Sequence, residues 1–185
     1  MKLYLVRHGE TAGNIQHRYV GWQDPPLTRH GLRQAEALAR ALASEPVTAV
    51  YSSDLTRAQQ TARPIAACLD LPVQTRMALR EVSFGQWDGL TYDEIQARDP
   101  AHLEAWLADP ERVAPPGGET LAQLRARLLT ALPIAEGALL VTHGGPIRTL
   151  VAHFTGRPFW DLQVPPGSVT VLVEGKVTSL PNVPA

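Results

Sequence analysis

The chain has 185 residues, of which 44% are hydrophobic and 19% are charged, and its formal net charge is −1. This length and composition are typical of a single globular domain, here spanning residues 1–185. The near-neutral charge argues against a nucleic-acid partner, because Lys and Arg are not in excess to neutralise a phosphate backbone. A small anionic ligand remains compatible, since it needs only two or three cations in a cleft.

The cysteine content and the length of the apolar segments exclude further classes. Cys68 is the one cysteine, so neither an intramolecular disulfide nor a cysteine-based zinc site can form, and its apolar neighbours predict that it is buried. No segment approaches the roughly 20 apolar residues of a membrane span. The apolar run over 3–6 is too short for the core of a signal peptide. We therefore expect a cytoplasmic protein that does not act on a membrane.

The first half of the chain alternates between predicted strands and predicted helices. Residues 3–6 form an apolar run without polar alternation, which is typical of a strand buried on both faces. Thr28 is a suitable N-cap for the helix that follows, in which apolar residues recur at helical spacing. A second strand is predicted over 47–51, a helix after it, and a short strand over 73–75.

The helix after the second strand carries two predictions of its own. Its cap is expected to be one of the polar residues that follow the strand, which are Ser52, Ser53 and Asp54. Pro64 lies inside the helical pattern and is expected to kink or end the helix, because proline has no backbone N–H to donate.

The second half begins with a loop-rich segment and then returns to strong helix and strand signals. Helices are expected over 92–98, 101–108 and 120–132 and from about Pro146, and strands over 138–142, 169–173 and 176–180. The last two strands are expected to form a hairpin around Glu174 and Gly175. Strands that alternate with helices predict a three-layer α/β/α sandwich with a mainly parallel central sheet.

Two of the predicted strands end in a histidine that is followed by glycine, at His8 and at His143. Because ligands bind at the carboxyl ends of parallel strands, we expect both histidines at one edge of the sheet. The helix N-termini that follow favour an anion there. Arg7 adds a planar cation suited to phosphate, and Arg57, about one turn into its helix, can point to the same edge.

The tripeptide Arg-His-Gly alone is not diagnostic, because it recurs at 29–31 in the first turn of a predicted amphipathic helix. We interpret His30 there as a surface residue. Structural alternatives exist for the other site residues too, since Arg7 can pair with Glu10 and Arg57 with Asp54. A metal site built from the two histidines and a carboxylate is disfavoured, because the neighbouring arginines repel a divalent cation.

The chain resembles the histidine phosphatase superfamily, the phosphoglycerate-mutase-like enzymes, through several motifs in the same order. They are LVRHGET at 5–11, YSS at 51–53, LRE at 79–81, PGGE at 116–119 and VTHGG at 141–145. The resemblance covers most of the chain and implies a phosphoglycerate-mutase-like fold that needs neither a metal nor a cofactor.

The resemblance also implies a catalytic set. His8 would attack phosphorus and form a covalent phosphohistidine, with its reactive ring nitrogen deprotonated. The groups that would hold the phosphoryl oxygens are Arg7, Arg57 and His143. Glu81 would give a proton to the leaving oxygen and then accept one from the attacking water. The role of Glu81 rests on the resemblance more than on its sequence environment, because a carboxylate in a loop is usually solvated. Glu10 is the alternative acid, since it lies closer to His8 in sequence.

The expected substrate is a small phosphorylated metabolite, and a homodimer is left open. The residues expected to bind the substrate are Asn14, Gly21, Gly144 and Trp22. Asn14 would add a neutral hydrogen bond to the phosphate. Trp22 and Trp87 lie in the matching loops and are the candidates to line the mouth of the site.

Three functions compete: a phosphomonoester hydrolase, a phosphoglycerate mutase, and a catalytically silent regulatory binding module of the same fold. Val20 stands where the mutases place a Ser or Thr that contacts substrate, and the segment between Glu81 and His143 is shorter than theirs. The silent module is disfavoured because every catalytic position holds a reactive residue type. Within the family, the segments 18–22 and 81–92 resemble α-ribazole 5′-phosphate phosphatases of cobalamin biosynthesis.

Overall fold

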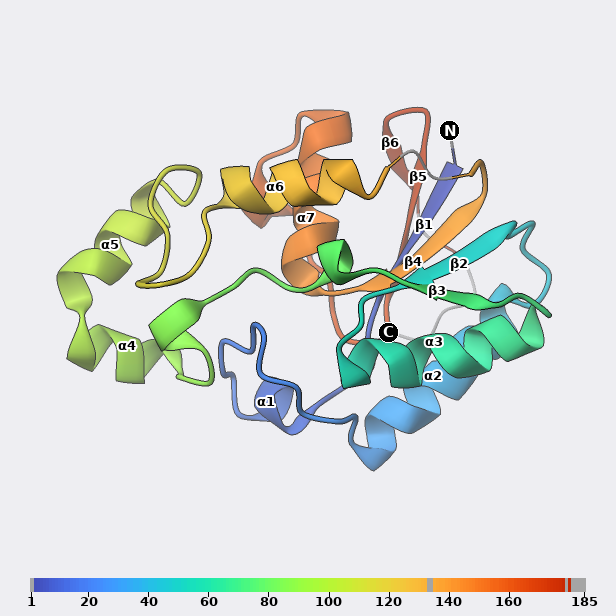
Figure 1. Ribbon diagram of the computed structural model, residues 1–185, viewed down its shortest axis with the longest axis horizontal. Helices are drawn as coiled ribbons and strands as arrows, with labels where there is room; N and C mark the ends of the chain where they lie inside the picture. The colour runs from blue at the N-terminus through green and yellow to red at the C-terminus, as the bar shows by residue number, and fades with distance from the viewer. Residues whose placement is uncertain (1, 133–134, 179, 181–185) are drawn as a thin grey trace.

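A mostly parallel sheet forms the centre of the computed structural model, which describes residues 2–132, 135–178 and 180 (Figure 1). Its strands are β1 (Lys2–Arg7), β2 (Ala49–Ser52), β3 (Val73–Thr75), β4 (Ala138–Thr142), β5 (Val169–Val173) and β6 (Lys176–Thr178). Their order across the sheet is β3-β2-β4-β1-β5-β6. The first four in that order are parallel, and β5 and β6 are antiparallel to their neighbours. The predicted α/β class with a mainly parallel sheet is confirmed.

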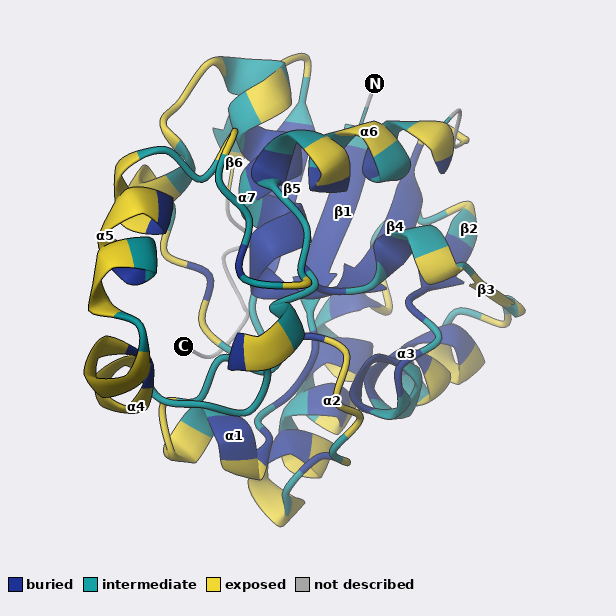
Figure 2. Cartoon of the chain, turned by 60° about the vertical axis from the view of Figure 1, so that its left-hand side comes forward, coloured by how far each residue is buried: buried dark blue, intermediate teal, exposed yellow. Residues whose placement is uncertain are grey.

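Two layers of helices cover the two faces of the sheet, as predicted (Figure 1). On one face α2 (Arg29–Leu42) and α3 (Thr56–Cys68) pack over the strands, and on the other α6 (Leu121–Thr130) and α7 (Gly144–Thr155) do so. The period-two alternation of strand side chains feeds both cores. Tyr4 and Val6 face the α2–α3 layer, and Leu3 and Leu5 face the α6–α7 layer. Strands buried on both faces explain the continuous apolar runs in the sequence (Figure 2).

The start of α2 follows the prediction, and the start of α3 does not. Thr28 caps α2 by accepting a hydrogen bond from the backbone N–H of Gly31 at 3.0 Å. The residue at the N-cap of α3 is Leu55, whose side chain makes no cap hydrogen bond. The first turn of α3 is instead bound by Asp24, which accepts from the backbone N–H of Thr56 at 2.6 Å and from its hydroxyl at 2.7 Å.

The last turns of α3 bear on two further predictions, a kink or an end at Pro64 and the burial of Cys68. The helix continues past Pro64 to Cys68, so the proline does not end it. Cys68 is exposed, and the expectation that it is buried was wrong. The apolar face of α3 runs through Ile65 and Ala66, and the next two positions turn outward because of the helical period.

A separate group of short helices stands beyond one end of the sheet. It contains α4 (Tyr92–Arg98), α5 (Pro100–Ala108) and the 3₁₀ helix η2 (Gly85–Trp87), and it has a small core of its own. The buried members of that core are Trp87, Ile95, Leu103 and Trp106. Figure 1 shows α4 and α5 at the left, beside the short helix α1 (Ala12–Ile15). The 3₁₀ helices η1 (Met77–Leu79) and η3 (Phe159–Asp161) complete the described elements.

The remaining differences from the predicted elements are small. α7 begins two residues before Pro146, and α1 was not predicted, because a single turn leaves no periodic signal. The expected hairpin around Glu174 and Gly175 is formed by β5 and β6, although residue 179 of the expected strand lies outside the described residues. No helix among the described residues is long and apolar enough to cross a membrane.

Backbone hydrogen bonds continue past the ends of β1, β4 and β2, so the residues that follow these three strands lie close together. The backbone N–H of His8 donates to the Thr142 carbonyl at 3.0 Å, and that of Ser53 donates to the Val141 carbonyl at 2.9 Å. Because β4 lies between β1 and β2, His143 follows the central strand of the three. His8, His143 and Ser53 therefore lie next to one another at the carboxyl edge of the sheet.

Candidate active site

The two strand-end histidines meet at this edge. The ring centroids of His8 and His143 are 5.0 Å apart with an edge-to-face arrangement, and both residues are buried. Their approach follows from the register, in which the end of β1 lies opposite the end of β4. The juxtaposition expected from the two His-Gly pairs is therefore present.

One hydrogen bond determines which nitrogen of His8 can react. Nδ1 of His8 lies 2.7 Å from the Gly9 carbonyl, which can only accept a hydrogen bond. In the neutral ring the proton therefore sits on Nδ1, and Nε2 carries the lone pair. Burial lowers the pKa of His8 well below its usual 6.5, and the positive charges of Arg57 and Arg7 lower it further. The ring is neutral at physiological pH, which is the form a nucleophile requires.

His143 is held by a hydroxyl on the neighbouring strand end. Its Nε2 lies 2.9 Å from Oγ of Ser53, and that oxygen also accepts from the backbone N–H of Leu55 at 3.3 Å. Burial lowers the pKa of His143 well below 6.5, with the charge of Arg57 acting in the same direction. When the Ser53 hydroxyl donates to Nε2, the ring proton lies on Nδ1. That nitrogen is buried and has no partner among the described residues.

Arg7 and Arg57 are fixed by hydrogen bonds to backbone carbonyls. Nη1 of Arg7 donates to the Val164 carbonyl, and Arg57 donates to the carbonyls of Gln23 and Gly21, both at 2.7 Å. The Nε atoms of both arginines are buried without a partner among the described residues. Since carbonyls carry no charge, much of the positive charge of each guanidinium remains available to an anion.

The two ion pairs considered as structural alternatives, Arg7 with Glu10 and Arg57 with Asp54, are not formed, because both acids bind other partners. Asp54 binds Arg80 at 2.8 and 2.6 Å, and Arg57 forms a long ion pair with Asp24 instead, with 4.0 Å between Nη1 and Oδ1. Glu10 accepts a hydrogen bond from the hydroxyl of Thr28 at 2.7 Å. Glu10 is thereby tied to the start of α2.

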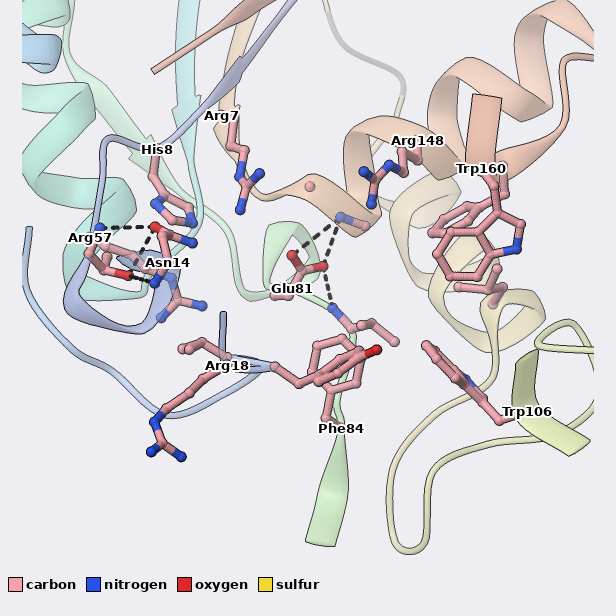
Figure 3. A pocket seen from close by; sticks show the side chains of 18 residues that line it. Arg7, His8, Asn14, Arg18, Arg57, Glu81, Phe84, Trp106, Arg148 and Trp160 are labelled. Carbon is pink, nitrogen blue, oxygen red and sulfur yellow. Dashed lines mark hydrogen bonds between the residues drawn. The ribbon is translucent and has the colours of Figure 1, made fainter. Parts of the chain in front are cut away.

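Glu81 lies between His8 and Trp106 in the cavity and is 8% exposed (Figure 3). Its Oε1 accepts from the backbone N–H groups of Val82 at 2.8 Å and Gly145 at 3.0 Å, and Oε2 lies 3.2 Å from the latter. The N-terminal turn of α7 thus holds a carboxylate, as helix N-termini commonly do. A loop carboxylate that looks solvated in the sequence is therefore ordered and directed into the site.

Arg127, which the sequence analysis missed, fixes the loop that carries Glu81. From α6 it donates to the carbonyls of Ala78 and Arg80 at 2.8 Å and of Glu81 at 2.7 Å, and it is paired with Glu119. No local pattern distinguishes Arg127 from a surface arginine, because the three carbonyls that it binds lie more than 40 residues away in the chain.

The four expected substrate-binding residues take different places. Asn14 and Gly144 line the cavity, and Figure 3 shows Asn14 beside His8 and Arg57. The carboxamide oxygen of Asn14 also accepts from the backbone N–H of Thr11 at 2.9 Å. Gly21 and Trp22 are not among the lining residues.

Gly21 and Trp22 support other site residues. The carbonyl of Gly21 binds Arg57, and the indole N–H of Trp22 donates to the Glu81 carbonyl at 2.9 Å. Trp87 is 2% exposed in the core of the short-helix group and does not line the cavity. Trp22 thus supports the loop of Glu81, and neither Trp22 nor Trp87 lines the cavity.

The cavity has a volume of about 210 Å³ and continues from His8 to a wall of aromatic side chains that the sequence analysis missed (Figure 3). The aromatic lining residues are Tyr19, Phe84, Trp106, Phe159 and Trp160. Arg148 also lines it and lies near enough to Arg7 for its charge to lower the pKa of that residue. Arg148 is one helical turn after Gly144, a spacing that could have identified it.

The arrangement suits phosphate chemistry. Arg7, Arg57 and Arg148 supply positive charge, His8 supplies a neutral nucleophile and Glu81 supplies a carboxyl group, all around one cavity. Within the described part of the chain, no three His, Cys, Asp or Glu residues are grouped so as to hold a metal ion.

Known proteins are similar to this chain in sequence and architecture. The sequence model of the histidine phosphatase superfamily (branch 1) matches residues 3–177. The adenosylcobalamin/α-ribazole phosphatase of Escherichia coli K12 is 33% identical over 176 residues, covering 90% of this chain and 87% of that protein. A probable phosphoglycerate mutase of Yersinia pestis is 34% identical over 164 residues, covering 85% of this chain and 76% of that protein.

The likeness extends to solved structures. A mycobacterial glucosyl-3-phosphoglycerate phosphatase, solved with VO3, superposes with a TM-score of 0.81 at 33% identity, over 93% of this chain and 90% of that one. These matches cover nearly the whole chain, and they agree with the paired histidines and arginines at the sheet edge. The chain belongs to the histidine phosphatase superfamily, branch 1.

Proposed function

We propose that this chain is a phosphomonoester hydrolase that works through a covalent phosphohistidine at His8 and needs no metal ion. The observation that carries the proposal is the tautomer of His8, whose Nδ1 is tied to the Gly9 carbonyl at 2.7 Å and whose Nε2 keeps its lone pair. That nucleophile stands in a cavity lined by Arg7, Arg57 and Arg148, which supply the charge that phosphoryl transfer requires.

In the first step Nε2 of His8 forms a bond to phosphorus as the bond from phosphorus to the leaving oxygen breaks. Glu81 enters as the protonated acid and gives its proton to that oxygen, so a neutral alcohol leaves. Arg7, Arg57 and the Nδ1–H of His143 would bind the non-bridging oxygens throughout.

In the second step a water oxygen attacks the phosphohistidine, and Glu81, now a carboxylate, takes a proton from that water. The bond from phosphorus to Nε2 breaks, inorganic phosphate leaves, and His8 and Glu81 return to their initial states. The backbone N–H groups of Val82 and Gly145 suit this step, because they stabilise the carboxylate that acts as the base.

The substrate that we propose is α-ribazole 5′-phosphate. The likeness to the E. coli enzyme of that name supports this choice, as do the sequence segments 18–22 and 81–92. The likeness to a probable phosphoglycerate mutase makes mutase activity the second candidate. Val20 weakens it, because the valine lines the cavity with a side chain that cannot form a hydrogen bond.

The test is a panel of α-ribazole 5′-phosphate, p-nitrophenyl phosphate, 3-phosphoglycerate and sugar phosphates, assayed with and without EDTA. We expect release of inorganic phosphate that EDTA leaves unchanged and that His8→Ala abolishes. Rapid quench with labelled substrate should trap one acid-labile phosphohistidine. Activity that EDTA removes and a divalent metal restores would refute the metal-free route, and interconversion of 3- and 2-phosphoglycerate would favour the mutase.

A further inference from the structure

The wall of the cavity farthest from His8 consists of aromatic side chains that come from segments far apart in the sequence. Phe84 comes from the loop after Glu81, Trp106 from α5 and Trp160 from η3. Figure 3 shows Trp106 and Trp160 on the far side of the cavity from His8, with Glu81 and Arg148 between, and Phe84 below Glu81. Segments so far apart in sequence form one surface only because the short-helix group folds back over the sheet edge.

These rings are held in place by one another. Trp106 contacts Trp160 at 6.0 Å and Phe84 at 6.3 Å between ring centroids, each nearly perpendicular, and Trp87 supports it from behind at 5.8 Å. Trp106 is 4% exposed, whereas Trp160 is 47% exposed although it lines the cavity. An exposed indole beside a buried aromatic cluster leaves ring surface available for an apolar or planar ligand.

Arg148 lies between the phosphate end of the cavity and this aromatic wall. Its Nε donates to the Leu162 carbonyl at 3.0 Å, and its guanidinium carbon lies 5.9 Å from the centroid of Phe159. It forms no ion pair with any of the described residues, in contrast to Arg18, which lines the same cavity and is bound to Glu94 at 3.0 Å. Its terminal N–H groups are therefore available to hydroxyl oxygens between a phosphate and a ring.

We propose that Phe84, Trp106 and Trp160 form a subsite for a planar ring on the leaving alcohol, with Arg148 on the sugar that joins ring and phosphate. The substrate class is then the 5-phosphates of ribosides that carry an aromatic heterocycle. This inference rests on the proposed function and adds the residues that select among phosphomonoesters.

The test compares two phosphates with the same leaving oxygen. One is α-ribazole 5′-phosphate, and the other is methyl riboside 5-phosphate, in which a methyl group replaces the heterocycle. We expect kcat/KM to be at least about tenfold higher for the first, the scale of one ring stacked on aromatic side chains. Trp160→Ala should bring the ratio of the two kcat/KM values close to one. Leu32→Ala is the matched control, because Leu32 on α2 is 43% exposed and outside the cavity.

The failure of this inference differs from that of the proposed function. Equal kcat/KM for both phosphates, or a ratio that Trp160→Ala leaves unchanged, would overturn the ring subsite while phosphatase activity stands. If neither phosphate is hydrolysed, calorimetric binding of both to the wild-type protein and to Trp160→Ala decides the question. Tighter binding of the ring-bearing phosphate to wild type alone would support the subsite, and equal binding would refute it.

Discussion

The carboxylate of Glu81 takes the place that a side chain on Gly145 would fill. Oε1 of Glu81 accepts the Gly145 backbone N–H at 3.0 Å, and a Cβ atom added to Gly145 would stand 2.3 Å from that same oxygen. A glycine at the second position of α7 thus allows the carboxyl group to approach the helix N-terminus. The adjacent Gly144 differs, because its added Cβ would meet Arg7 at 3.6 Å, an ordinary contact distance.

Gly145→Ala should therefore displace Glu81 without altering the nucleophile. We expect kcat to fall by roughly 10²-fold, the scale of a misplacement of about 1 Å, with phosphohistidine still formed from activated substrates. Gly144→Ala should cause a clearly smaller loss. Steady-state kinetics on p-nitrophenyl phosphate and on an alkyl phosphate measure the effect, which should be larger for the alkyl phosphate because its leaving oxygen needs the proton more. Equal losses in the two variants would contradict the role given to Glu81.

Ser53 should act on catalysis through His143. In Ser53→Ala the Nε2 of His143 loses its partner at 2.9 Å, so the ring is free to carry its proton on the wrong nitrogen. We expect roughly tenfold lower kcat/KM, the worth of one buried hydrogen bond, and rescue by Ser53→Thr, which keeps the hydroxyl. The ¹⁵N chemical shifts of the His143 ring report the tautomer directly. An unchanged tautomer together with full activity in Ser53→Ala would show that the hydroxyl does not orient the ring.

Local signals in the sequence were enough to predict the phosphate end of the site. His8 and His143 each follow an apolar run, and the rule that parallel strands share a carboxyl edge places them together. Arg57 was predictable for a similar reason, because it lies one turn after a strand. The same reasoning gave Ser53 only as a helix cap, since the hydrogen bond to His143 depends on β2 and β4 being neighbours in the sheet.

The alcohol end of the site could not be predicted from local patterns. Trp22 and Trp87 stood in recognisable motifs, yet Trp106 and Trp160 are the tryptophans that line the cavity. Their positions depend on how the short-helix group and η3 fold over the sheet edge, and this depends on tertiary packing. The cap of α3 has the same origin, because Asp24 reaches Thr56 from 32 residues away.

Both buried histidines should make the fold sensitive to mild acid. Burial and the nearby arginines keep His8 and His143 neutral in the folded state, with pKa values well below 6.5, whereas in the unfolded chain they titrate near 6.5. As the pH falls below about 6.5, the unfolded chain binds protons that the folded chain does not, so the free energy of unfolding falls. The limiting slope is about 1.4 kcal/mol per pH unit for each histidine.

Urea unfolding between pH 7.5 and 5 measures this dependence. The pKa values of three carboxyl groups are lowered, chiefly by hydrogen bonds: Glu45 by Tyr4, Asp54 by Arg80 and Glu94 by the backbone of Thr91. They lose their contribution only as the pH falls below about 4.5, so the histidines dominate the window. His8→Asn should lower the slope of the free energy of unfolding against pH by the contribution of one histidine. A free energy of unfolding that stays constant from pH 6.5 to 5 would mean that the histidines are not held neutral.

Arg57→Lys should separate charge from geometry at the phosphate. Arg57 is 1% exposed and spans the carbonyls of Gln23 and Gly21, which a planar guanidinium can do while a further N–H remains for the substrate. A lysine ammonium keeps the charge and cannot make all three contacts. We expect kcat/KM to fall by roughly 10²-fold, the loss of a bidentate charge-assisted contact, with KM for phosphate esters raised. Arg125→Lys is the control, because Arg125 pairs with Glu111 on the surface of α6, outside the cavity. Wild-type kinetics in Arg57→Lys would show that positive charge alone suffices and that the two carbonyl contacts have no part in positioning the phosphate.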